Sequence, residues 1–408
     1  MLNIIVVGGS IGGLMAGVAM KRLGHTVTVY ERSPSRLLHD RGAGIVVGGE
    51  TLEYFTKHDR TQTPLYVRSP FRHNLDREGG EASRSNYPQE MTSWDLLYHI
   101  LRANFDGLET PYVNQCAARD DVQGEYRHGH SVEKVETEEG TGKVKVFYRT
   151  HEGQEGNTTA DMVIAADGSG GTLRKYLLPN VVRTYAGYVA WRGTVVESKL
   201  SEEAKDALVE RFTFYHAPHI QLQMLSYLIP GENGSIEPGK RKLNWVWYNN
   251  IEEGSEHWNS TMTDTDGVLH NYIMPVGKVR PEILEAQLAK ARAVLPPQFS
   301  EIVHKTETPF IQAITDVICP KVTFLDGRVV LLGDSIAGFR PHTAASTSQA
   351  AMNSLLLEAL MKKTGGVLGK REAAIYEENS LAYATQLSEH GIRLGNRSQF
   401  GEQRCAIQ

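Results

Sequence analysis

The residues with the clearest chemical meaning form a glycine-rich loop, Gly8-Gly9-Ser10-Ile11-Gly12-Gly13, followed at a distance by Glu31. Gly8 permits a tight turn, and Gly13 lets a helix pack closely on a strand. The free amides and the dipole at the start of such a helix attract a pyrophosphate, and the Glu31 carboxylate can accept hydrogen bonds from a ribose diol. The pattern predicts a dinucleotide site for NAD, NADP or FAD, although Ser10 replaces the middle glycine of G-x-G-x-x-G.

Two further loops place a carboxylate beside a glycine at the end of an apolar run. Asp167-Gly168 follows residues 162–166, and Gly333-Asp334 follows residues 328–332. Ligands of open α/β sheets bind at the carboxyl ends of the strands, where these carboxylates would lie. Either loop alone is more typical of a simple turn. Combined with the glycine-rich loop, they indicate one nucleotide site built from both ends of the chain.

These loops require a parallel sheet, and the rest of the chain predicts how that sheet is completed. Residues 4–31 read as strand, helix and strand, residues 126–150 as hairpins, and residues 185–250 as alternating strands rich in β-branched and aromatic residues. Helical spacing covers 281–295, 346–361 and 371–393. We predict an α/β fold with a Rossmann-like nucleotide domain, an inserted β-sheet domain and C-terminal helices. The expected domains are 1–184 with 320–370 for the nucleotide, 185–319 for the substrate, and 371–408 for a C-terminal helix and tail.

Composition restricts the function classes. The 408 residues suffice for two domains, and a formal net charge of −5 argues against nucleic acid or an anionic membrane as partner. No run approaches the roughly 20 apolar residues of a membrane span. Cys116, Cys319 and Cys405 are too dispersed for a disulfide framework, and no cluster has metal-ligand spacing. We expect a soluble cytoplasmic protein without a metal; the sequence leaves open whether it forms a homodimer.

The three loops, together with Arg340-Pro341-His342, resemble the single-component FAD-dependent aromatic hydroxylases, the class A flavoprotein monooxygenases. The resemblance includes Tyr30–Pro34, Gly44–Val47, Tyr185–Val189 and Trp191–Gly193, and it extends from the first strand to about residue 360. It implies the aromatic hydroxylase fold, with FAD as cofactor and NADH or NADPH as a transient electron donor.

For the cofactor, the resemblance implies that Asp334 contacts the ribityl chain and that Pro341 lies beside the isoalloxazine ring. The helix after Ala345 would direct its N-terminus at the flavin N1–C2=O edge, and Asp167-Gly168 would lie near the pyrophosphate. Arg41 follows the second strand closely enough to reach a phosphate, with a solvated loop arginine as the alternative. The residues that we assign to the cofactor are Gly8, Ser10, Ile11, Gly12, Gly13, Glu31, Arg32, Arg41, Asp167, Gly333, Asp334, Pro341, Ala345, Ser346 and Thr347.

Three positions depart from the pattern of the family. Ser346-Thr347 occupies the place where relatives often carry a glycine pair, and Trp94 stands where many carry an arginine that steadies the flavin. Gly171 replaces a serine that is common in the segment leading to Arg174. FAD binding is still expected, but contacts from residues 94 and 171 are put in doubt.

The reaction that the resemblance implies begins with reduction of FAD by NAD(P)H. O₂ then adds at flavin C4a, and the hydroperoxide hydroxylates an electron-rich, phenol- or hydroxypyridine-like small molecule. A base with a pKa near neutrality would help by deprotonating a ring hydroxyl. Epoxidation or oxidative rearrangement of a heteroaromatic metabolite stays open as an alternative, as does a flavin oxidase or reductase without oxygen insertion.

Candidate residues for this chemistry lie mainly in the inserted β-rich segment. The catalytic candidates are His219, Tyr215 and His342, and His216 is a further candidate in the inserted segment. The substrate candidates are Tyr188, Arg192, Tyr227, Trp245 and Trp247. The two tryptophans are two positions apart on a predicted strand and so share one face, which would stack on a substrate or pack in the core.

Overall fold

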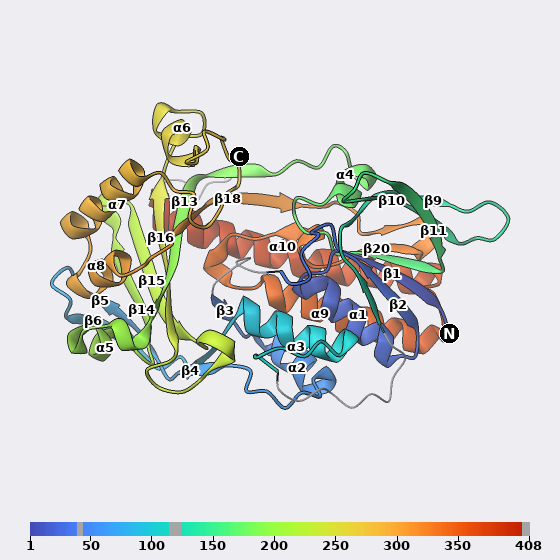
Figure 1. Ribbon diagram of the computed structural model, residues 1–408, viewed down its shortest axis with the longest axis horizontal. Coiled ribbons are helices and arrows are strands. Elements are labelled where there is room, and N and C mark those ends of the chain that lie inside the picture. Colours follow the sequence, from blue (N-terminus) through green and yellow to red (C-terminus); the bar gives the residue numbers. More distant parts are fainter. Residues whose placement is uncertain (39–43, 114–123, 402–408) are drawn as a thin grey trace.

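Two large β-sheets lie side by side along the long axis of the molecule, and helix α10 (Lys370–Phe400) runs between them (Figure 1). The structure is a computed structural model, and it describes residues 1–38, 44–113 and 124–401. Arg41 and two of the three cysteines, Cys116 and Cys405, therefore lie outside the described residues.

The first sheet is the Rossmann-like sheet that the sequence predicts. Its six strands follow the order β19-β20-β12-β1-β2-β8. They are β1 (Asn3–Val7), β2 (Thr26–Tyr30), β8 (Glu125–Arg127), β12 (Met162–Ala165), β19 (Thr323–Phe324) and β20 (Val329–Leu331). All the pairings are parallel except that of β19 with β20. The carboxyl ends of β1, β12 and β20 are thereby brought to one edge, which is where the three predicted loops begin.

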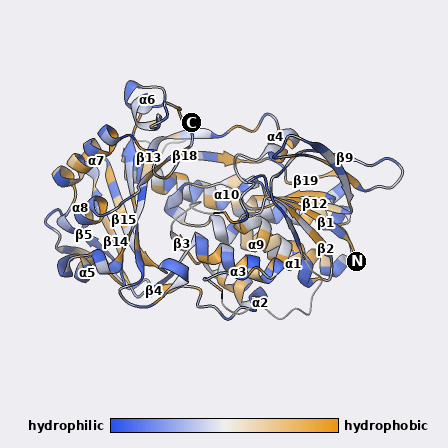
Figure 2. Cartoon of the chain, in the orientation of Figure 1, coloured by the Kyte–Doolittle hydropathy of each residue, from blue (hydrophilic) through white to orange (hydrophobic). Residues whose placement is uncertain are grey.

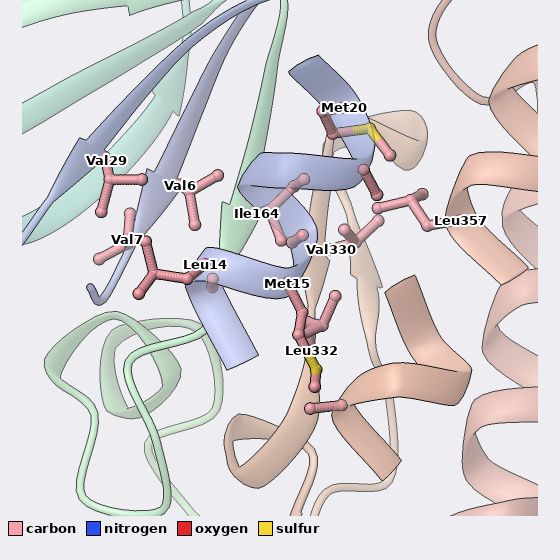
Figure 3. Close-up of a cluster of buried hydrophobic side chains, with 14 of the residues drawn as sticks. Val6, Val7, Leu14, Met15, Met20, Val29, Ile164, Val330, Leu332 and Leu357 are labelled. Carbon is pink, nitrogen blue, oxygen red and sulfur yellow. The ribbon is translucent and has the colours of Figure 1, made fainter. Parts of the chain in front are cut away.

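Helix α1 (Ile11–Arg22) fixes the position of that edge because it is buried between the sheet and other helices. Figure 3 shows Leu14 and Met15 of α1 among side chains from β1, β2, β12 and β20 and from α9 (Ser346–Thr364), and both α1 side chains are fully buried. Strands β1, β12 and β20 are also almost uniformly hydrophobic (Figure 2), as expected for the part of a parallel sheet that is covered on both faces. On the other side, α1 contacts α3 (Trp94–Asp106).

The second sheet contains the strands predicted between residues 185 and 250. Its order is β17-β18-β13-β16-β15-β14-β5-β6, with β21 paired to β18. The bounds are β5 (Arg72–Leu75), β6 (Glu81–Ser85), β13 (Thr184–Val196), β14 (Phe212–Ala217), β15 (Leu222–Ile229), β16 (Lys242–Asn250), β17 (Ile273–Met274), β18 (Phe310–Ile318) and β21 (Ala337–Gly338). Strands β5 and β6 come from the N-terminal third of the chain. The predicted boundary at residue 185 did not anticipate this, because those strands are short and polar; the domain boundaries stay a prediction.

Smaller elements complete the molecule. They are the sheet β3-β7-β4 (Gly44–Val46, Gln89–Ser93, Val67–Ser69), the hairpin sheet β9-β10-β11 (His130–Thr137, Val144–Thr150, Glu155–Ala160), and the helices α2 (Gly49–His58), α4 (Thr172–Leu177), α5 (Glu202–Leu208), α6 (Glu256–Met262), α7 (Pro281–Val294) and α8 (Pro297–His304). The predicted helices at 281–295 and 346–361 correspond to α7 and α9. In the described ranges, no helix is both long and apolar enough to cross a membrane.

Helix α10 extends beyond the predicted end at residue 393 and reaches Phe400. It contacts β19 of the first sheet and β15, β16 and β18 of the second. Asn250 at the end of β16 donates to the carbonyl oxygen of Gln399 at 2.7 Å. The last turns of α10 are therefore positioned against the second sheet.

The glycines of the first loop differ in how much space surrounds them, and this gives a test of the fold. A Cβ at Gly13 would overlap the carbonyl oxygen of Gly8, whereas a Cβ at Gly12 would meet side-chain carbons of Ala350 and Leu332 at 3.5 and 3.6 Å. We expect Gly13→Ala to lower the free energy of unfolding by about 1–3 kcal/mol, the usual cost of overpacking. Gly12→Ala is the matched control and should change it by less than about 1 kcal/mol. Thermal and urea unfolding followed by circular dichroism measures both; equal losses would contradict the packing described here.

Candidate active site

A cavity of about 1020 Å³ joins the two sheets. One end is lined by the loops that follow β1, β12 and β20, and the other by side chains of the second sheet and the last turns of α10. Residues that are far apart in the sequence therefore share one cavity.

At the first end, Glu31 holds the glycine-rich loop in place. Its carboxylate accepts one hydrogen bond from the Gly9 amide and one from the Ser33 amide, both at 2.8 Å. Each carboxylate oxygen keeps a second lone pair for a ligand. Ser10 precedes α1, and its side chain makes no capping bond, so the first-turn amides of that helix are not capped by a side chain. Gly8, which adopts a positive φ of 102°, and Ser10 both line the cavity.

The second acidic loop is fixed from within the protein. Asp167 accepts from the Leu173 amide at 2.8 Å and from the Ser335 hydroxyl at 3.1 Å. Burial raises the pKa of the Asp167 carboxyl, and these hydrogen bonds oppose the rise. Asp167 thus joins α4 to the loop after β20 while it also lines the cavity.

The third loop presents Asp334 to the cavity beside the start of α9. The Asp334 side chain faces the cavity, which lies deep inside the protein. Desolvation at that depth raises the pKa of its carboxyl to about 6. The Ser346 hydroxyl and the Arg183 charge act in the opposite direction. Helix α9 begins after Ala345 without a side-chain cap, and Ser346 and Thr347 line the cavity.

At the other end, strand register arranges the cavity-facing side chains in cross-strand rows. One row is polar: Gln312 and Tyr248 both pair with Ala190, Tyr248 also pairs with Gln223, and Gln223 pairs with His216. The next row consists of Arg192, Val246, Leu225 and Phe214. A third row contains Tyr227, Phe212 and Arg72. The second sheet thus presents a surface of aromatic, apolar and hydrogen-bonding groups.

His342 lies above the polar row and belongs to a buried network. Its ring stacks on Tyr248 with centroids 4.4 Å apart, and its Nε2 lies 3.0 Å from the Tyr188 hydroxyl. Arg340 interacts with that hydroxyl, donates to both Asp316 carboxylate oxygens at 2.6 to 3.0 Å, and donates to Asn396 Oδ1 at 2.8 Å. Burial, followed by the charge of Arg340, lowers the pKa of His342 to about 3, so its ring is neutral at pH 7.

Comparison with known proteins agrees with this geometry. A family model described as FAD binding domain-like matches residues 185–316. The chain is 28% identical over 404 residues to 2,6-dihydroxypyridine 3-monooxygenase of Paenarthrobacter nicotinovorans, covering 98% of this chain and 93% of that protein. It is 23% identical to 6-hydroxynicotinate 3-monooxygenase of Pseudomonas fluorescens, covering 94% and 89%.

Among solved structures, 2,6-dihydroxypyridine-3-hydroxylase from Arthrobacter nicotinovorans superposes with a TM-score of 0.83 at 26% identity, covering 98% of this chain and 93% of the other. Over nearly its whole length, this chain is therefore similar in sequence and fold to an FAD-dependent aromatic hydroxylase. Klebsiella pneumoniae HpxO complexed with FAD and uric acid has the same fold, with a TM-score of 0.71 at 20% identity and coverage of 99% and 90%. The predicted fold class and cofactor are thus confirmed.

The donor and acceptor groups of the cavity fit FAD. Two helix starts without side-chain caps, those of α1 and α9, supply amides and positive dipole ends for anionic groups. Glu31 and Asp334 supply acceptors, which suit the hydroxyl groups of a ribose and a ribityl chain. Apolar side chains of Leu38, Ile45 and Trp94 line the same part of the cavity.

The three departures from the family pattern have structural explanations. Trp94 lines the cavity and stacks on Tyr98 at 5.0 Å with an interplanar angle of 12°, so it forms an aromatic wall where an arginine was expected. A Cβ at Gly171 would overlap the Asp167 carboxylate, so a serine there would displace Asp167. Ser346 and Thr347 occupy the first turn of α9 with ordinary helical placement.

Most of the residues assigned to the site come together in the cavity. Those that line it are Gly8, Ser10, Ile11, Gly12, Glu31, Arg32, Asp167, Asp334, Pro341, His342, Ala345, Ser346, Thr347, Arg192 and Tyr227. Gly13 and Gly333 lie behind the lining, where Gly13 allows α1 to pack and the Gly333 amide donates to Asn353 at 3.1 Å. Tyr188 also lies behind the lining, where its hydroxyl contacts His342, which does line the cavity.

Other candidates face elsewhere, and their assignments are corrected. Trp245 and Trp247 share a face, as expected, but it is the face away from the cavity, where Trp245 donates to Thr306 at 2.8 Å. Tyr215 alternates with the cavity-facing residues of β14 and is buried on the opposite side. His219 lies exposed after that strand and does not line the cavity. The structure gives these four residues no contact with the cavity.

Several cavity residues were not assigned to the site from sequence, namely Arg72, Gln223, Tyr248, Gln312 and Arg397. His216, a candidate from the sequence, does line the cavity, and it shares that face of β14 with Phe212 and Phe214. Which parity faces the cavity depends on the packing of α7 and α8, and that packing is not visible in the strand itself.

Asp334 gives a pH test of cofactor binding. Because its folded-state pKa is about 6, it is ionised above that pH and accepts hydroxyl hydrogen bonds best there. FAD affinity should therefore fall as pH is lowered through 6, by up to about tenfold per pH unit. Asp334→Asn should bind FAD more weakly at pH 8 and lose this dependence. Fluorescence titration of FAD between pH 5 and 8 measures both, and the same slope in the two proteins would contradict the assignment.

Proposed function

We propose that the protein hydroxylates a small hydroxylated pyridine or related heteroaromatic ring, with NADH or NADPH as electron donor and O₂ as co-substrate. The observation that carries the proposal is the shared cavity, which joins the FAD loops to a surface of aromatic and hydrogen-bonding side chains. Two of the relatives described above act, by their names, on hydroxypyridine rings.

Bound FAD supplies the redox chemistry, taking electrons from the nicotinamide and transferring one oxygen atom from O₂. The chain's own task is to hold the ring, exclude water and favour the ionised ring hydroxyl. Val246, Leu225 and Phe214 provide an apolar surface on which a planar ring can lie. The guanidinium of Arg192 is held by a neutral group, because its Nη1 donates to Gln312 Oε1 at 3.0 Å.

His342 is the group that we assign to the ring hydroxyl, as a hydrogen-bond donor rather than a base. Arg340 donates a hydrogen bond to the Tyr188 hydroxyl oxygen. The Tyr188 hydroxyl therefore donates its own proton to His342 Nε2. This fixes the His342 proton on Nδ1, for which the described residues offer no partner. With its pKa lowered to about 3, the ring does not take up a proton at pH 7. A neutral donor stabilises an oxygen that becomes negative.

A substrate panel tests the proposed function. We expect hydroxylated pyridines to accelerate NADH or NADPH oxidation and to yield ring-hydroxylated products, because the cavity admits a planar ring beside the cofactor loops. The panel contains 2,6-dihydroxypyridine, 6-hydroxynicotinate, a phenol and an indole; products are identified by mass spectrometry with ¹⁸O₂. Stimulated oxidation that yields only hydrogen peroxide, for every ring, would contradict the proposal.

The network behind His342 allows a second test. Tyr188→Phe removes the donor to His342 Nε2, so we expect product formed per NADH to fall about three- to tenfold, the loss of one buried hydrogen bond. FAD affinity should stay within about twofold, because Tyr188 does not line the cavity. Tyr185→Phe is the control: its hydroxyl donates to the Ile251 carbonyl oxygen at 2.9 Å, on the same strand but away from His342. Equal effects of the two variants would refute the role of the network.

A further inference from the structure

The carboxylates that line the cavity are confined to one of its two ends, where Arg32 and Arg183 also line it. Within the described residues, the lining carboxylates are Glu31, Asp167 and Asp334, and all three follow strands of the first sheet. The end formed by the second sheet and α10 has Arg72, Arg192 and Arg397. No described carboxylate lines that end, so its positive charge is not balanced from within the lining.

Two of these arginines are held by neutral partners. Arg72 Nε donates to Gln89 Oε1 at 2.6 Å, and Arg192 is held by Gln312. Burial without a neighbouring carboxylate lowers the pKa of Arg72. Keeping cations in such surroundings costs free energy that an anionic ligand would recover.

Arg397 differs from the other two because nothing holds it. Its guanidinium has no hydrogen bond or ion pair with any described residue, and its side chain is exposed at the edge of the cavity. Leu394, Arg397 and Ser398 have helical i, i+3 and i+4 spacing, so they share the face of α10 that lines the cavity.

The backbone that carries Arg397 is firmly placed. A Cβ at Gly395 would overlap the Tyr188 hydroxyl, so the glycine brings α10 against β13. Asn396 accepts from Arg340, and the Gln399 carbonyl oxygen accepts from Asn250. These contacts hold both sides of Arg397 while its own side chain stays free.

Arg397 also lies at one end of the polar row. Its charge, after burial, is the next cause of the lowered pKa of His216. His216 Nε2 lies 3.5 Å from Gln223 Nε2, and Gln223 leads along the row to Tyr248 and His342. A ring bonded to His342 at one edge could thus extend a substituent toward Arg397.

We infer that Arg397, with His216 beside it, forms an anion subsite that holds a carboxylate on the substrate ring. A guanidinium binds a carboxylate through two parallel hydrogen bonds and distinguishes it from a neutral group of the same shape. The inference rests on the proposed function and narrows its substrate class, from hydroxylated heteroaromatic rings in general to those that carry a carboxylate.

The test compares 6-hydroxynicotinate with 6-hydroxynicotinamide, which differ in charge but hardly in size. Binding to the FAD-loaded protein is followed by the change in flavin absorbance, with no turnover needed. We expect the carboxylate to bind at least about tenfold tighter, the value of one charged hydrogen-bond pair. Arg397→Leu should remove that preference by weakening the carboxylate alone. Arg393→Leu is the control, because Arg393 lies one turn earlier, faces Glu389 at 3.9 Å and does not line the cavity.

Three outcomes would overturn the subsite: equal affinities for acid and amide, a preference that persists in Arg397→Leu, or equal weakening of both ligands in that variant. A loss that also affects 2,6-dihydroxypyridine would place an ionised hydroxyl there and overturn the carboxylate assignment. Turnover of 2,6-dihydroxypyridine by the unaltered protein keeps the two proposals separate. If it is hydroxylated while no acid preference exists, only the subsite fails; if no ring is hydroxylated, the proposed function fails, and the binding comparison still judges the subsite.

Discussion

The buried guanidinium of Arg340 joins the parts of the molecule that must meet at the site. It pairs with Asp316 on β18, bonds Asn396 on α10 and engages Tyr188 on β13. A buried cation that loses its partners costs several kcal/mol, about 3–5 for a broken pair, so these three elements are held to one arrangement. The chain continues from Arg340 directly into Pro341 and His342, and the position of the substrate end relative to the cofactor loops follows from this network.

The nucleotide half was readable from the sequence because its requirements are local. A glycine that would clash with any side chain, as Gly13 would, marks close packing within six residues. Buried strands of three to five residues that end in Asp167 or Gly333-Asp334 mark the binding edge without knowledge of their neighbours. Glu31 lies farther along the chain but still within the same strand–helix–strand unit, and it accepts from amides of the loop and of Ser33.

The substrate half could be read only in part, because its residues are chosen by long-range packing. The alternation of β14 and β16 was visible, but not which parity faces the cavity, so Tyr215, Trp245 and Trp247 were preferred to His216 and Tyr248. Arg397 gave no signal at all, since an exposed arginine near the end of a helix is ordinary. It acquires meaning only because Gly395 brings α10 against β13.

The lining carboxylates lie at one end of the cavity because the nucleotide half and the substrate half of the site are built from different elements. Acceptors for hydroxyl groups sit at strand ends, where the dinucleotide fold places them whatever the substrate. Arg72, Arg192 and Arg397 sit on sheet positions and on one helix face, where a substitution alters the lining without touching the loops that we assign to FAD. A scaffold of this kind can change its substrate while it keeps its cofactor chemistry. Relatives named for dihydroxypyridine, hydroxynicotinate and urate share it. What distinguishes them should therefore be sought along the cross-strand rows and the inner face of α10, rather than in the glycine-rich loop.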